Sequence, residues 1–69
     1  MQPQTVRVTS GHRAGQIGLA TERTANGYWV RFYSVHDPKT TNEAEIIQSL
    51  HKGHADSIMK LHASELYFQ

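Results

Sequence analysis

The sequence predicts a single, mainly β domain over residues 5–69, a small barrel with a short helical insert before its last two strands. Stretches in which apolar and polar residues alternate show the period of half-buried strands. Glycine-containing turns separate these stretches. The chain has 69 residues and no cysteine, so it can build one modest hydrophobic core without disulfides or thiolate metal sites.

A polar lead-in over residues 1–4 precedes the first predicted strand. Alternation then places Val6 and Val8 on one side of the chain and polar residues on the other. Gly11 and Gly15 follow, and each can adopt a positive φ that is costly for other residues. We therefore predict a strand that ends in a tight turn.

Residues 16–21 are predicted to form the second strand. Ile17 and Leu19 fall on one face, and two small residues, Gly18 and Ala20, fall on the other. Small residues inside a strand are typical of a bend or of close contact between backbones.

Asn26-Gly27 predicts a tight hairpin turn, because both residues tolerate positive φ. Aromatic and β-branched residues are dense over residues 28–35, as in a strand. Pro38 cannot donate a main-chain hydrogen bond and is expected to follow the end of this third strand.

The segment after this strand has a helical pattern. Thr40 and Glu43 have the spacing of a capping box. The apolar residues at helical intervals are Ala44, Ile47 and Leu50. We interpret residues 41–51 as a helix within an insert of residues 41–52, with a strand over residues 44–50 as the alternative.

Two short strands are predicted to complete the barrel, over residues 57–61 and 66–68, with a single tight turn between them. We expect one core that collects the alternating apolar residues of the first three strands. Its expected members are Val6, Val8, Ile17, Leu19, Tyr28, Val30 and Phe32.

The opposite face of the third strand is the first candidate binding surface. Alternation leaves Trp29, Arg31 and Tyr33 to face outward, near Arg7 on a neighbouring strand. Aromatic residues interleaved with arginine suit base stacking and phosphate contact. They equally suit a protein interface. The alternative is that the insert folds over this face and makes it a second small core.

The tip of the first turn, His12-Arg13, is the second candidate, because a basic pair on a rigid loop is a natural contact point. The alternative is a solvated pair.

His51 and His54 raise the question of a metal site, since imidazole binds zinc. Gly53 is expected to break the helix between them, so we expect neither a metal nor another cofactor.

Charge and motifs narrow the function classes. Seven Lys+Arg and six Asp+Glu give a formal charge of +1, far below that of a dedicated phosphate-backbone binder. We therefore expect a protein partner rather than a nucleic acid, with RNA, single-stranded DNA and self-association as alternatives. No nucleophile elbow or phosphate-binding glycine loop occurs, so we expect no enzyme.

Apolar runs stay far below the roughly 20 residues that span a bilayer, and the first residues do not show the pattern of a secretion signal. We expect a cytoplasmic protein that does not bind a membrane.

Residues 6–32 carry a recognisable motif. Its residues are Val6-Arg7-Val8, Ser10-Gly11, Ala14-Gly15-Gln16, Gly18 and Tyr28-Trp29-Val30-Arg31-Phe32. This pattern resembles the KOW motif, which consists of a strand, a glycine turn, a further glycine and a second strand. The resemblance implies a five-stranded SH3-like barrel that acts as an adaptor in a nucleoprotein or transcription–translation assembly. A protein-docking or self-assembling accessory subunit is the alternative.

A second resemblance concerns an enzyme. Its residues are Ser10-Gly11, Gly15-Gln16-Ile17, Gly27-Tyr28 and Val30. They are similar to the type II dihydrofolate reductases, SH3-like barrels that form a tetramer around one active-site pore. The pore-lining Val-Gln-Ile-Tyr run of that family aligns with Ile58-Met59-Lys60-Leu61, which has neither the glutamine nor the tyrosine. A pore-type reductase is therefore only the third hypothesis.

Overall fold

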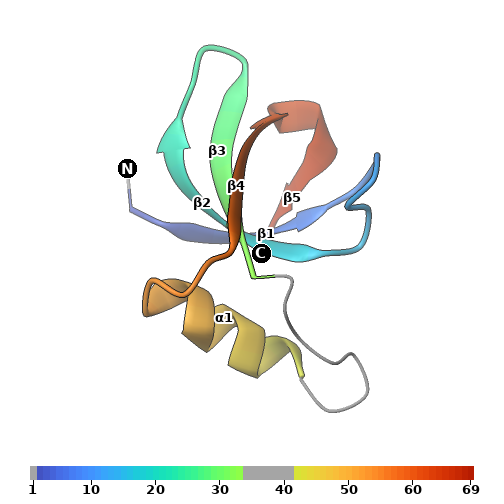
Figure 1. Ribbon diagram of the computed structural model, residues 1–69. Coiled ribbons are helices and arrows are strands. Elements are labelled where there is room, and N and C mark those ends of the chain that lie inside the picture. Colours follow the sequence, from blue (N-terminus) through green and yellow to red (C-terminus); the bar gives the residue numbers. More distant parts are fainter. Residues whose placement is uncertain (1, 34–41) are drawn as a thin grey trace.

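The computed structural model describes residues 2–33 and 42–69, which form one five-stranded antiparallel sheet and a short helix (Figure 1). Its elements are β1 (Gln4–Val8), β2 (Ile17–Arg23), β3 (Gly27–Phe32), α1 (Glu43–His51), β4 (Ser57–His62), a 3-10 turn (Ala63–Glu65) and β5 (Leu66–Phe68). The strand order is β4-β3-β2-β1-β5, and the sheet coils into a small barrel-like domain. The predicted fold class, mainly β with a helix before the last two strands, is confirmed.

The turn between β1 and β2 forms as predicted. Gly11 and Gly15 have φ values of 85° and 86°, in the region that favours glycine. The Gly15 N–H donates to the Val8 carbonyl at 2.7 Å, which closes the turn onto the end of β1. The lead-in is shorter than predicted, because Gln4 already pairs with Ala20.

The connection from β2 to β3 differs from the prediction. β2 continues to Arg23, with an irregular register between Ala20 and Glu22. The predicted hairpin forms, because β2 and β3 pair antiparallel on either side of residues 24–26. Neither residue of Asn26-Gly27 has a positive φ, so the turn conformation that we expected there is wrong. Gly27 instead begins β3, and its carbonyl accepts a hydrogen bond from the Thr24 N–H at 2.8 Å.

The helix is confirmed and its strand alternative is wrong, but α1 begins later than predicted. Its N-cap is Asn42, whose side-chain oxygen accepts a hydrogen bond from the Glu45 N–H at 2.9 Å. The predicted cap, Thr40, lies outside the described residues, as do Pro38 and the predicted last residues of the third strand, 34–35.

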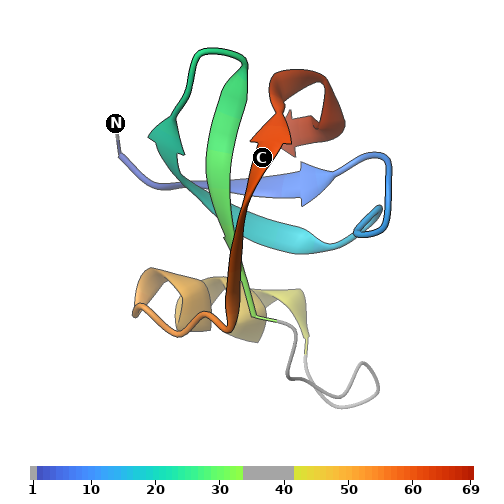
Figure 2. The same cartoon turned by 45° about the horizontal axis from the view of Figure 1, so that its top comes forward.

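The barrel has two small cores rather than the single core that we expected. The inner core consists of Val6, Val8, Ala20, Val30 and Phe32. The second core lies under α1 and consists of Ile17, Leu19, Ile46 and Leu50, with Tyr33 and Ile47 packed against it. Figure 2 shows α1 lying across one end of the sheet.

The small residues of β2 explain this division. Val6 pairs with Gly18, so Gly18 faces the barrel interior. A Cβ at Gly18 would lie only 2.6 Å from Val30 Cγ1, so the interior has no room for a larger residue there. Ile17 and Leu19 must therefore point outward, where α1 removes them from water. Our expectation that they join Val6 in one core is wrong for this reason.

Candidate docking surface

Arg7 lies on the outer face but is engaged within the fold. One of its guanidinium nitrogens donates to both carboxylate oxygens of Glu43 at 2.8 Å, and the other donates to the Gly15 carbonyl at 2.8 Å. Arg7 therefore joins β1 to the start of α1, and it is not available as a contact residue.

We expect Arg7→Ala to lower the free energy of unfolding by about 0.5–1 kcal/mol. The Arg7 guanidinium contacts both carboxylate oxygens of Glu43, but the ion pair is partly exposed, at 33% for the Arg7 side chain and 58% for the Glu43 side chain. Chemical denaturation followed by circular dichroism measures this loss. Arg31→Ala is the matched control, because the Arg31 side chain is exposed and makes no hydrogen bond or ion pair with another described residue. Equal stability of the two variants would contradict the assignment.

Arg13 is also engaged within the fold. Its guanidinium carbon lies 4.4 Å from the centre of the Phe32 ring. Its nitrogens donate to Gln16 Oε1 at 3.1 Å and to Ser57 Oγ at 3.0 Å. Of the pair predicted at the tip of the first turn, only His12 is exposed to solvent.

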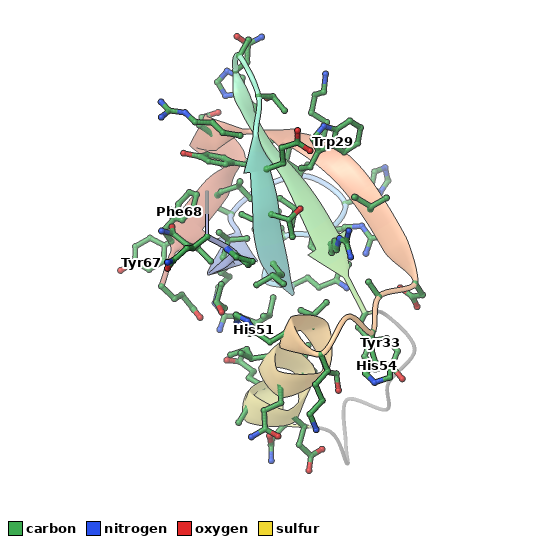
Figure 3. All side chains as sticks on the ribbon, turned by 90° about the vertical axis from the view of Figure 1, so that its left-hand side faces the viewer. Trp29, Tyr33, His51, His54, Tyr67 and Phe68 are labelled. Atoms are coloured by element: carbon green, nitrogen blue, oxygen red, sulfur yellow. The ribbon has the colours of Figure 1, made fainter. Side chains whose placement is uncertain are left out.

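The outward-facing residues of the third strand separate into two groups. Tyr33 packs against the second core under α1. Trp29 lies at the end of the sheet away from α1, as Figure 3 shows. The alternative that the insert covers this face is therefore correct for Tyr33, whereas Trp29 and Arg31 stay outside the cover.

Two residues of β4 that are not among the predicted contact residues lie beside Trp29 and Arg31. Arg31 pairs with Ile58, and Trp29 pairs with Lys60. The Lys60 ammonium lies 5.6 Å from the centre of the Trp29 ring, and Ile58 is 52% exposed. We call these four residues the outer strip. The alternation of residues 57–61 was the signal that could have placed Ile58 and Lys60 on this face.

A hollow lies on the other side of β4, between its edge and the first turn. It has a volume of about 240 Å³. Its lining includes Val8, His12, Arg13, Met59 and Leu61. Met59 is 37% exposed although it pairs with the buried Val30. We call this hollow the edge groove.

The described residues do not bring metal ligands together. Within residues 2–33 and 42–69, no group of three or more His, Cys, Asp or Glu side chains could hold an ion. His51 and His54 lie well apart at the end of α1 (Figure 3). His62 caps the 3-10 turn, where its ring nitrogen accepts a hydrogen bond from the Ser64 N–H at 3.1 Å.

Comparison with family models, curated proteins and solved structures finds no match for this chain. In the part of the chain that the structure describes, no helix is long and apolar enough to cross a membrane.

Proposed function

We propose that this protein is a non-catalytic adaptor module that binds a protein partner through its outer strip. The observation that carries the proposal is the strip itself, in which Trp29 and Arg31 lie next to the exposed Ile58 on a hydrogen-bonded sheet. Tryptophan and arginine are the side chains that most often dominate protein interfaces. The resemblance to the KOW motif supports a nucleoprotein or transcription–translation assembly as the setting.

The distribution of charge favours a protein partner over a nucleic acid. Arg7 and Arg13 are held by hydrogen bonds within the fold, which removes two cations from contact with phosphate. The outer strip has two cations, Arg31 and Lys60. An acidic residue of β2, Glu22, pairs with Trp29 beside them. Affinity for nucleic acid rises with the number of phosphate contacts. A surface with this small number of cations is therefore expected to bind nucleic acid weakly.

Site-specific photo-crosslinking in the native cells tests this proposal. A photo-crosslinking amino acid replaces Ile58 in one variant and Gln48, which is exposed on α1, in the matched control. We expect a discrete protein adduct from position 58 that is absent from position 48. Because Arg31 pairs with Ile58, Arg31→Ala in the first variant is expected to remove the adduct.

Two results would contradict the proposal. Equal adducts from positions 58 and 48 would show that the outer strip is not the docking surface. Adducts that nuclease digestion removes, together with quenching of Trp29 fluorescence by single-stranded oligonucleotides in a salt-dependent manner, would identify a nucleic-acid partner instead. Trp29 is the only tryptophan of the chain, so its fluorescence reports on the strip alone.

A further inference from the structure

The free edge of β4 continues the outer strip. β4 is an edge strand that hydrogen-bonds only to β3. On its other side, no described residue pairs with the main chain of Ser57–Leu61, whereas the His62 N–H donates to the Glu65 carboxylate at 3.0 Å. An edge strand of this kind presents main-chain donors and acceptors to an added strand.

Side chains on the two faces of β4 differ in chemistry. Met59 and Leu61 lie on the side of the edge groove, whose lining also includes Val8. Ile58 and Lys60 lie on the outer face, beside Arg31. A strand added to β4 would therefore place alternate side chains over an apolar hollow and beside two cations.

We propose that the partner docks as an extended segment of alternating apolar and acidic residues, which adds a strand to the free edge of β4. This inference rests on the proposed docking function and names the form of the partner. The apolar side chains of the segment enter the edge groove beside Met59. Its carboxylates face Lys60 and Arg31, which have no carboxylate partner among the described residues.

A second copy of this chain fits the edge less well. The outward residues of β4 are Ile58, Lys60 and His62, and none of them is acidic. Pairing of two β4 strands would bring the lysine of one copy onto the cationic face of the other. Like charges on facing strands destabilise the pair.

The probe for this inference is a capped peptide that alternates valine and glutamate. Its controls are a peptide that alternates valine and lysine, and a peptide of the same composition with the valines and glutamates in separate blocks. Two further versions of the first peptide carry N-methyl groups on alternate residues, one version for each edge of the added strand. Binding is followed by Trp29 fluorescence and by hydrogen exchange of the β4 amides.

We expect the alternating valine–glutamate peptide to bind at least about tenfold more tightly than both control peptides and to slow exchange of the β4 amides. One N-methylated version is expected to bind at least about tenfold more weakly, because it cannot donate hydrogen bonds to β4. Lys60→Glu, with an unchanged thermal transition, is expected to reverse the preference toward the valine–lysine peptide.

Three results would overturn the inference. They are equal binding of the alternating and block peptides, equal binding of both N-methylated versions and their parent, and dimerisation that protects the β4 amides without peptide. The crosslinking experiment separates the two proposals. A discrete adduct at position 58 together with any of these three results retains the docking function and rejects addition of a partner strand. Equal adducts at positions 58 and 48 reject the docking function itself.

Discussion

Replacement of Phe32 with alanine is expected to leave much of the protein unfolded at room temperature. Phe32 has no exposed surface and is the largest of the fully buried side chains. Removal of a buried phenylalanine ring costs about 3–5 kcal/mol, because it loses burial and leaves a cavity. The Phe32 ring also contacts the guanidinium of Arg13, whose central carbon lies 4.4 Å from the ring centre. A domain of this size has a total stability of roughly 0.05–0.15 kcal/mol per residue, so one such loss is comparable with the whole.

Urea denaturation followed by far-ultraviolet circular dichroism measures this effect. Phe32→Leu is the matched control, because leucine keeps part of the volume and the apolar character of the site; we expect a clearly smaller loss. Phe68→Ala tests whether the loss of stability depends on position in the core. Phe68 packs at the margin of the same core, edge-on to Tyr28 with ring centres 4.9 Å apart. A loss below about 1 kcal/mol for Phe32→Ala would contradict the assigned core.

Replacement of Gly27 with alanine is expected to destabilise the protein by about 3 kcal/mol, the upper part of the range for overpacking. A Cβ at this position would overlap the carbonyl oxygen of Leu61. It would also lie 2.8 Å from the Cα of His62 and 2.9 Å from the nitrogen of Ala63. All three are backbone atoms, so relief requires that β3 separate from the end of β4.

Gly15→Ala is the control for this prediction. Gly15 has a φ of 86° and no atom within 4 Å of an added Cβ, so its substitution costs only backbone strain. That strain is about 1–2 kcal/mol. Thermal unfolding of both variants compares a steric penalty with a conformational one. If Gly15→Ala were the more damaging substitution, the close contact between β3 and β4 would be wrong.

The course of the chain could be predicted wherever neighbouring residues decide it. The glycine turn after β1 is one case, because positive φ is a property of single residues. The helix is another, although Asn42 rather than Thr40 caps it. Of the predicted apolar positions Leu50 is buried and Ile47 half-buried, whereas Ala44 is exposed and Ile46 is buried in its place. The hairpin at Asn26-Gly27 forms, but without the positive φ that we expected of these two residues. Gly27 instead allows close contact with Leu61, a residue of a distant segment.

The candidate site was only partly predictable. Alternation along β3 correctly placed Trp29 and Arg31 on the outer face. The internal roles of Arg7 and Arg13 were not visible, because their partners, Glu43 and Ser57, lie 36 and 44 residues away along the chain. From the sequence alone, all four of these cationic and aromatic side chains are equally good candidates for contact with a partner.

The sequence by itself determined the succession of strands along the chain, the first turn and the presence of the helix, because local backbone preferences and side-chain periodicity encode them. Only the tertiary structure decided which face of β2 the helix covers, which arginines stay available and that the edge of β4 remains open. These outcomes depend on which distant segments meet once the sheet coils. The outer strip is therefore a product of packing, formed where α1 does not reach.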